Sequence, residues 1–524
     1  MAIIRPGNPA TGRVRVPGPA GTCSIGLGMA LLLTAGSGAE PAVAPRYDIV
    51  LAGGRVIDPE SGLDARRDIG ITGGRIAAIA PGPLEGGDRV DVSRLAVAPG
   101  FIDLHAHGQD PHSNGLQARD GVTTALDLEL GAYPVAAFYR AREGRAPINY
   151  GVTVGHIPAR LKLKHGVDAV HPLTTPRLTG GLRGVLMRWV RRVWQPRGYA
   201  LEPANAEEIE RLRGLLAAGL DDGGLGIGVG LDYAPGATSA EIRMLFALAA
   251  ERRVPVVVHM RGVAGPEDMS AIEELLGLVE ATGAPLHICH ITSSGQRRTA
   301  AYLARIEQVR ARGFDVTTEV YPYTAASTSI ESSFFDEGWQ TRLGLTYGDL
   351  QWPRTGERLT AETFARYRKT GGFVIIQDIV PAEIASAALA HPLVMIASDG
   401  LPMLDGGEHP RGAGTYARVL GRYVREERTL PLMEAVRKMA LMPAQRLEGF
   451  VPAMRNKGRL RVGADADLVV FDPERVIDRA TFEDSWQPSE GIVHVVVGGT
   501  FVVRDSVLIG DAFPGREIRA PRGG

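Results

Sequence analysis

Short apolar runs that alternate with helical segments constrain the fold of this 524-residue chain more than any other feature. Between residues 255 and 400 these runs are "PVVVH", "PLHICH", "FDVTTEVYPY", "FVIIQD" and "LVMIASDG". Continuous apolar runs of this kind are typical of parallel strands that are buried on both faces. Strands that alternate with helices over this length predict an α/β protein built on a (β/α)8 barrel.

The segments between the runs carry helix-end signals. Asn205–Glu208 and Thr238–Glu241 have the spacing of capping boxes, in which two residues bond each other's backbone N–H groups. Gly283 stands where a helix that begins near Glu267 is expected to end. These signals support the alternation of strands and helices.

A chemically reactive side chain follows most of the predicted strands. These side chains are His105 and His107, Glu129, His156, His259, His290, Tyr321 and Asp399. In a (β/α)8 barrel the carboxyl ends of the strands form the active-site face. The two histidines of "GFIDLHAHG" also lie two residues apart, so a strand would point both rings toward one position of metal-ion size. The sequence therefore predicts a polar site at this face.

Two β-rich segments flank the predicted barrel. Residues 46–98 include "YDIVLAGGRVIDPESG", and residues 451–516 include "GRLRVGADADLVVFDPE" and "GIVHVVVGGTFVVRD". Because chain ends often lie close together, we expect both segments to form one small β-domain beside a barrel of residues 99–450.

Residues 1–39 have a basic start, a short apolar stretch and small residues at the end, which predicts a signal-peptide-like leader. The expected location is periplasmic or secreted, with the cytoplasm as the alternative.

Composition excludes several classes of protein. The chain has 58 basic and 59 acidic side chains, and a net charge of −1 argues against a nucleic-acid binder. Only Cys23 and Cys289 are present, so neither a disulfide framework nor an all-cysteine zinc site is expected.

Residues 159–198 carry nine basic residues, and "LRGVLMRWVRRVW" at 182–194 has an apolar stripe opposite a cationic face. This segment predicts a lid or dimer element, with a membrane-surface helix as the alternative.

The motifs taken together resemble the amidohydrolase superfamily, and more narrowly the D-aminoacylase (N-acyl-D-amino-acid deacylase) family. The resemblance rests on "GFIDLHAHGQD", "GVTT", "VGHIPAR", "LGIGVGLDYAPG", "HMR", "ICHITSSG", "EVYPYTAAST", "IASDG", "HPRGAGTYARVLGRYVRE", "GRLRVGADADLVVFDP" and "PGR". It extends from about Tyr47 to Arg516. It implies a metal-dependent hydrolase barrel with a small β-domain built from both chain ends.

The resemblance also implies an activity. The expected reaction is zinc-dependent hydrolysis of the linear amide bond of N-acyl amino acids of D configuration, with one or two Zn2+ ions. It assigns His105, His107, His259 and His290 as metal ligands and Asp399 as the catalytic acid/base. Neutral imidazoles suit Zn2+, and a site with few protein ligands leaves room for water.

The chain departs from the family at two positions. D-aminoacylases commonly have a cysteine ligand after the "GVTT" strand, whereas this chain reads "GVTTALDLELG". Glu129 is therefore the candidate that bridges two metals or completes one site. Asp127 competes for this role, and a carboxylated Lys162 or Lys164 is a third option. Thr292 stands where the family often has a lysine, which leaves the substrate contacts there open.

Four residues are assigned to the substrate. Arg411, in "HPRGAG", resembles the arginine that holds the substrate carboxylate, which a guanidinium can bind through two parallel hydrogen bonds. Tyr321 and Ser327 resemble substrate-lining residues, and His156 is expected either to shape the pocket or to play a structural part.

The expected partner is a small molecule, while a homo-oligomer stays an open alternative. The alternative functions are a cyclic amidase of the dihydropyrimidinase or dihydroorotase kind, which "HICHITSS" also resembles, and an inactive scaffold of the same fold.

Overall fold

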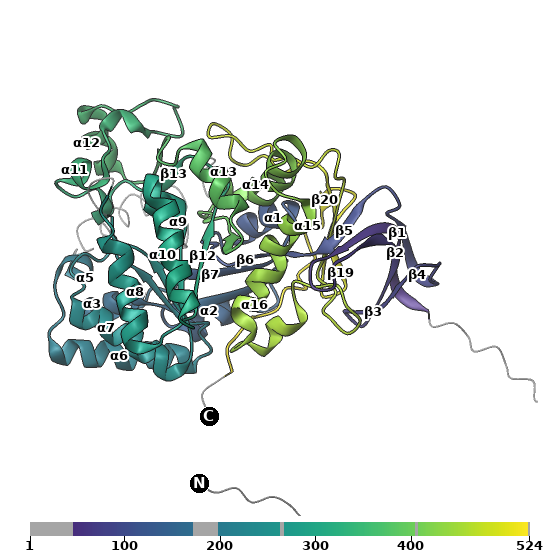
Figure 1. Ribbon diagram of the computed structural model, residues 1–524, viewed down its shortest axis with the longest axis horizontal. Coiled ribbons are helices and arrows are strands. Elements are labelled where there is room, and N and C mark those ends of the chain that lie inside the picture. Colours follow the sequence, from purple (N-terminus) through teal and green to yellow (C-terminus); the bar gives the residue numbers. More distant parts are fainter. Residues whose placement is uncertain (1–45, 171–197, 263–266, 404–406, 522–524) are drawn as a thin grey trace, which may run out of the picture. The chain divides into compact units, whose positions relative to one another are not determined.

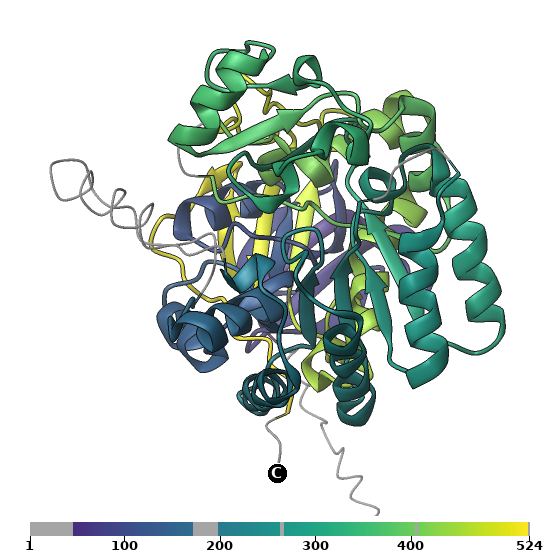
Figure 2. The same cartoon turned by 90° about the vertical axis from the view of Figure 1, so that its left-hand side faces the viewer.

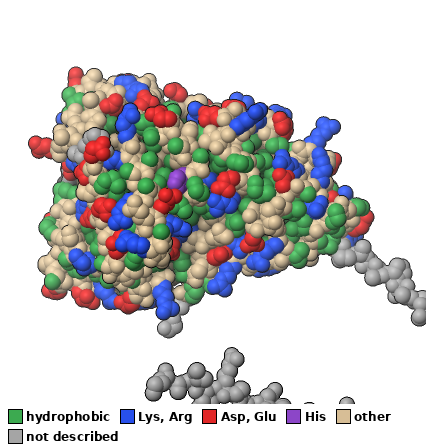
Figure 3. Space-filling model, viewed as in Figure 1, with side chains coloured by type: hydrophobic (Ala, Val, Ile, Leu, Met, Phe, Trp, Pro, Cys, Tyr) green, Lys and Arg blue, Asp and Glu red, His purple; other side chains and the backbone are tan. Residues whose placement is uncertain are grey.

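The computed structural model describes residues 46–170, 198–262, 267–403 and 407–521. The predicted leader at 1–39 and the basic stretch at 182–194 lie outside these ranges. Among the helices that the described ranges contain, none has the length and apolarity to cross a membrane. On the face shown in Figure 3, basic and acidic side chains are interspersed.

The centre of the fold is an eight-stranded parallel sheet that curves into a barrel (Figures 1 and 2). Its strands are β6 (Phe101–Asp103), β7 (Val122–Ala132), β8 (Asn149–Gly155), β9 (Ile227–Gly230), β10 (Val256–His259), β11 (Leu286–Ile288), β12 (Val316–Val320) and β16 (Val394–Ile396). Beyond the ends of β6 and β16, an isolated bridge between Ala106 and Gly400 joins the first strand to the last. The backbone N–H of His107 donates to the Gly400 carbonyl at 2.8 Å across this seam. The predicted barrel is confirmed.

Helices surround the barrel (Figure 2). They are α1 (Pro111–Arg119), α2 (Val135–Arg142), α3 (His156–His165), α5 (Gly198–Leu201), α6 (Ala206–Asp221), α7 (Ser239–Arg252), α8 (Ser270–Thr282), α9 (Ile291–Gly295), α10 (Thr299–Ala311), α13 (Ala382–Ala390), α14 (Arg411–Arg418), α15 (Leu432–Val436) and α16 (Met442–Glu448). Asn205 and Glu208 form the predicted capping box at α6, and α8 ends at Gly283 in the left-handed region. At α7 only Thr238 caps, because the Glu241 carboxylate is paired with Arg160 instead.

One apolar run does not belong to the barrel. "FVIIQD" was expected among the barrel strands, but β15 (Phe373–Ile376) lies in a separate three-stranded sheet with β13 (Ala326–Ser329) and β14 (Leu350–Gln351). The pairing is antiparallel. This sheet and the helices α11 (Trp339–Leu343) and α12 (Ala361–Thr370) share an apolar cluster of their own. A short apolar run indicates that a strand is buried but not which strands it pairs with. The run alone therefore does not distinguish a barrel strand from a strand of another sheet.

The two chain ends meet in one nine-stranded sheet. Its strands are β1 (Tyr47–Asp58), β2 (Leu63–Thr72), β3 (Arg75–Ala80), β4 (Gly86–Asp91), β5 (Ala96–Pro99), β17 (Leu468–Phe471), β18 (Ile492–Val497), β19 (Thr500–Arg504) and β20 (Val507–Leu508). The ends join where β17 pairs antiparallel with β5. The predicted β-domain from both chain ends is therefore confirmed.

A buried charge pair fastens this sheet to the barrel. Asp467, in "GADADLVV", accepts a hydrogen bond from Lys457 Nζ at 2.6 Å and one from Asn149 Nδ2, on strand β8, at 2.9 Å. Its other carboxylate oxygen accepts from the backbone N–H of Gly498 at 2.7 Å. The Lys457 and Asp467 side chains are only 6% and 4% exposed. Removing one partner of such a pair leaves the other charge buried without compensation.

Asp467→Ala should therefore lower the free energy of unfolding by about 3 kcal/mol. Asp465, 3.1 Å from Lys457 Nζ, moderates the loss. Asp64→Ala is the control, because it removes an exposed salt bridge to Arg55 and should cost less than about 1 kcal/mol. Denaturant unfolding followed by circular dichroism measures both changes. Equally small losses in the two variants would show that the buried pair does not hold the two parts together.

Candidate metal centre and substrate cavity

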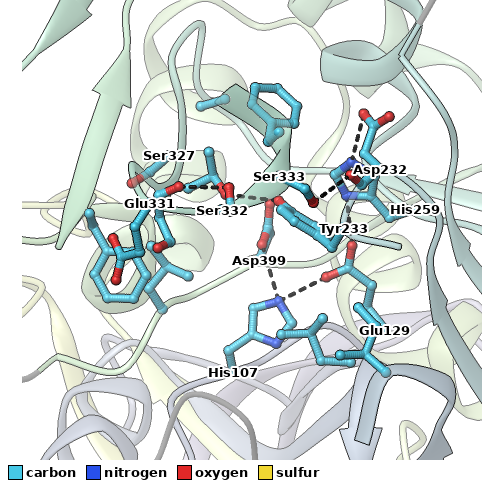
Figure 4. A pocket seen from close by; sticks show the side chains of 18 of the residues that line it. His107, Glu129, Asp232, Tyr233, His259, Ser327, Glu331, Ser332, Ser333 and Asp399 are labelled. Carbon is cyan, nitrogen blue, oxygen red and sulfur yellow. Dashed lines mark hydrogen bonds and ion pairs between the residues drawn. The ribbon is translucent and has the colours of Figure 1, made fainter. Parts of the chain in front are cut away.

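A cavity of about 2350 Å³ opens above the carboxyl ends of the barrel strands. His107, Glu129, His259, His290 and Asp399 all line it. Figure 4 shows the Glu129 carboxylate between the rings of His107 and His259, with Asp399 near His107. The predicted histidines and acids thus converge at the predicted face.

The first half of the cluster surrounds one carboxylate oxygen of Glu129. His105 Nε2 and His107 Nε2 each lie 3.0 Å from Glu129 Oε2, and the two nitrogens are 3.1 Å apart. Asp399 Oδ1 lies 3.4 Å from the first nitrogen and 3.5 Å from the second. Four potential ligand atoms therefore surround one position.

The second half faces the other oxygen of the same carboxylate. Glu129 Oε1 lies 2.8 Å from His259 Nδ1 and 3.5 Å from His290 Nε2. A single carboxylate thus separates two groups of imidazole nitrogens. This is the arrangement in which one carboxylate can serve two cations.

The donor set fits a divalent cation. His105 Nδ1 donates to Glu319 at 2.9 Å and His107 Nδ1 donates to Asp127 at 3.0 Å, which leaves both Nε2 atoms as acceptors in the neutral rings. The lone pairs of the two Nε2 atoms and the Glu129 Oε2 atom then face one another at about 3 Å. A bound cation would stabilise this arrangement. Imidazole and carboxylate ligands of this kind suit Zn2+.

The two acids in the cluster are held ionised. Burial raises the pKa of the Glu129 carboxyl, but the charge that His105 carries when it is protonated, and hydrogen bonds from the surrounding imidazoles, outweigh burial and lower the pKa well below its usual range. Burial also raises the pKa of Asp399, and the Arg411 guanidinium and the His105 charge reverse this effect and lower it. The cluster therefore presents two negative charges to balance cations.

The candidate bridging groups differ in their positions. Asp127 lies behind the cluster, where it accepts from His107 Nδ1 and from the backbone N–H groups of residues 130 and 131. Lys162 pairs with Asp168 at 2.9 Å, and Lys164 donates to Glu208. Of the three options, only Glu129 stands among the imidazoles.

Two acids were missed from the sequence. Glu319 Oε1 accepts from His105 Nδ1 and also from the backbone N–H of His290 at 2.7 Å, where the φ angle of His290 is +29°. Asp232 accepts from the backbone N–H of Gly262 at 2.7 Å and lies 3.6 Å from His259 Nε2. Glu319 is two residues before Tyr321 on the same predicted strand, and this spacing could have identified it.

His156, predicted to shape the pocket, does not line it. Its Nε2 lies 2.7 Å from Glu241, and the side chain is fully buried. Arg160 Nη1 contacts the same carboxylate at 2.5 Å. The buried Arg160–Glu241 pair holds His156 away from the cavity. Of the two roles expected for His156, the structural one fits this position.

The predicted carboxylate anchor is buried beside Asp399. Arg411 Nη2 lies 2.9 Å from Asp399 Oδ2 and donates to the Ser327 carbonyl at 3.3 Å. The guanidinium lies over the Tyr321 ring, 4.6 Å from its centre. Within the described ranges, Arg411 Nε and Nη1 and the Tyr321 hydroxyl lack hydrogen-bond partners. Buried donors of this kind are rare. Arg411 does not itself line the cavity, but Tyr321, Ser327 and Asp399 beside it do, and a ligand carboxylate among them would satisfy these donors.

Comparisons with known proteins find relatives along most of this chain. An N-acyl-D-glutamate deacylase of Alcaligenes xylosoxydans xylosoxydans is 32% identical over 501 residues, which cover 87% of this chain and 94% of that protein. The structure of an N-acyl-D-glutamate deacylase from Bordetella bronchiseptica, complexed with zinc and a phosphonate inhibitor, is similar with a TM-score of 0.72 at 29% identity. It covers 91% of this chain and 100% of that chain.

A structure of D-aminoacylase with a binuclear metal centre is similar to the same degree. Its TM-score is 0.72 at 26% identity, and the match covers 90% of this chain and 100% of that chain. Residues 90–503 of this chain match the amidohydrolase family as a whole. The resemblance found in the sequence is thereby confirmed, and the chain belongs to the amidohydrolase family.

Proposed function

We propose that this chain hydrolyses the linear amide bond of N-acyl D-amino acids and releases a carboxylate and a free amino acid. The observation that carries the proposal is the convergence of four imidazoles and two ionised carboxylates beside the unsatisfied donors of Arg411. The similarity to N-acyl-D-glutamate deacylase and D-aminoacylase supports the substrate class.

Two Zn2+ positions follow from the ligand geometry. His105 and His107 would hold one ion, with Asp399 beside it as the acid/base, and His259 and His290 would hold the other. The bridging ligand would be Glu129, which offers one oxygen to each position. Zn2+ at such a site polarises a carbonyl oxygen and lowers the pKa of water from about 15.7 toward 7.

The protein's own side chains would orient the substrate and move the proton. Arg411 and the Tyr321 hydroxyl hold the free carboxylate, which fixes the scissile amide above the cluster. Asp399 is ionised and lies between the cluster and Arg411, so it can accept a proton from the attacking water. It then returns this proton to the departing amine nitrogen.

Two alternatives have less support. A cyclic amidase would use the same barrel and the same ligands, but the relative at 32% identity acts on a linear N-acyl amino acid. An inactive scaffold would have no need to keep all four histidines, Glu129 and Asp399 in one cluster with their rings oriented by buried acids. Linear amide hydrolysis is therefore the function that the site supports best.

The metal content tests the bridge. The purified protein should contain two zinc ions per chain, lose activity on chelation and recover it when Zn2+ is added. Glu129→Gln should retain at most one ion, because a neutral amide leaves the positive charges uncompensated. Elemental analysis of the folded protein measures both.

Asp127→Asn is the matched control for Glu129→Gln. It should keep both ions but bind them about 10–100-fold more weakly, as expected for a residue that orients a ligand. Unchanged zinc content in Glu129→Gln, with loss in Asp127→Asn, would move the bridge to Asp127. Full activity in metal-free protein would refute the proposed function.

Asp399→Asn separates proton transfer from metal binding. The variant should keep its fold and its zinc, change KM little and reduce kcat by about 10²- to 10⁴-fold, the usual contribution of a positioned acid–base group. Steady-state kinetics and zinc analysis of the same preparation measure both. Zinc loss in parallel with kcat would make Asp399 a ligand only, and near-normal turnover would remove it from the mechanism.

Arg411→Lys tests the carboxylate anchor. The lysine keeps the charge but loses the planar fork, so kcat/KM for free-acid substrates should fall. N-acyl amino amides, which lack the carboxylate, should be poor substrates of the wild type and little affected by the change. Because Arg411 also contacts Asp399, an equal loss on both substrate classes would show that it acts through Asp399 instead.

A further inference from the structure

The cavity is larger than a short N-acyl amino acid requires. Its volume is about 2350 Å³, whereas sites for drug-sized ligands span roughly 300–1,000 Å³. An N-acetyl amino acid is smaller than such ligands and would fill only the part next to the metal cluster. The chemistry of the walls indicates what the remaining space binds.

The polar anchor occupies one side of the barrel mouth. Tyr321 follows β12. Ser327 lies in β13 and Arg411 begins α14, and Arg411 donates a hydrogen bond to the Ser327 carbonyl. In the order of the eight-stranded sheet, β8 is four strands from β12 and so lies across the barrel. A substrate held by its carboxylate at Arg411 therefore extends over the cluster toward β8.

The wall above β8 begins with apolar side chains. Leu130 lies near the end of β7, Ile157 and Tyr233 follow β8 and β9, and the three side chains gather over Gly230. A Cβ atom at Gly230 would lie 2.9 Å from Tyr233 Cδ2, 3.2 Å from Ile157 Cδ1 and 3.8 Å from Leu130 Cδ2. Leu130 directly follows Glu129, and the Tyr233 ring centre is 4.9 Å from that of His259. The apolar surface thus starts at the metal cluster.

Helix α3 extends this surface outward. Ile157 and Leu161 are four residues apart, so they lie on the same helix face with Leu161 about 6 Å further along the axis. Leu201 of α5, a helix that packs against α3, lines the same cavity and is 43% exposed. Leu130, Ile157, Leu161, Leu201 and Tyr233 are here called the apolar wall. All are half-buried or exposed, as expected for a surface that a ligand covers.

We propose that the apolar wall binds the acyl chain of the substrate, and that the preferred substrates carry a medium-length or longer unbranched acyl group rather than acetyl. This inference rests on the proposed function. The carboxylate and the acyl chain of an N-acyl amino acid leave the amide bond in opposite directions. With the carboxylate at Arg411 and the amide at the cluster, the acyl chain lies along the wall.

A series of acyl lengths on one D-amino acid tests this inference. The acetyl, butanoyl, hexanoyl and octanoyl derivatives should be compared with the zinc-loaded enzyme, below the concentrations at which they form micelles. Each methylene that reaches the wall should raise kcat/KM by about four-fold, the effect of removing one CH2 group from water. Activity on the acetyl derivative that equals or exceeds activity on octanoyl would overturn the acyl assignment and leave the proposed function standing. Inactivity on every derivative would instead refute the proposed function.

Variants locate the effect on the wall. Leu161→Asp and, separately, Leu201→Asp place a charge on the outer part of the wall and should lower the octanoyl-to-acetyl ratio of kcat/KM by at least ten-fold. Val462→Asp is the control, because Val462 is 64% exposed and does not line the cavity, and it should leave the ratio unchanged. An unaltered ratio in both wall variants would contradict the proposal. Using two positions keeps the test valid if one variant fails to fold.

Discussion

The site depends on one buried carboxylate. Glu129 lies among four imidazoles, and its two oxygens face two different pairs of rings. Buried charges are stable only when they are paired, so the carboxylate holds the rings as firmly as the rings hold it. Neutralising it would leave the two groups of ring nitrogens without the carboxylate that faces both of them.

Barrel closure brings Asp399, the proposed proton-transfer group, to the two histidines beside that carboxylate. His105 and His107 follow the first strand, and Asp399 follows the last, so the seam between β6 and β16 must close before the three can meet. Gly400 accepts from His107 N–H across the seam, and the φ angle of Asp399 is +50°, in the left-handed region. Sparsely populated backbone of this kind persists where the surrounding structure fixes it. Here the backbone hydrogen bonds that close the barrel are the same ones that position the aspartate.

The barrel and the main cluster could be predicted because each followed from local pattern. Runs of apolar residues indicated the strands, and the reactive residues after them indicated a shared face. Glu319 was missed because it precedes the end of its strand, and only the three-dimensional structure shows its contact with His105, 214 residues away. His156 lies outside the cavity because it pairs with Glu241, 85 residues later in the chain, and no local pattern reveals this pairing. Predictions failed where long-range partners decide the outcome.

In the proposed mechanism, the Arg411 guanidinium links substrate recognition to proton transfer. One of its nitrogens contacts Asp399, while the other two are buried without partners among the described residues. A buried donor without a partner costs about 1–3 kcal/mol. A substrate carboxylate would recover that energy at the moment when it places the amide above the cluster. Because the same guanidinium also keeps Asp399 ionised, an anchored substrate would meet a base that is already in position and in the correct charge state.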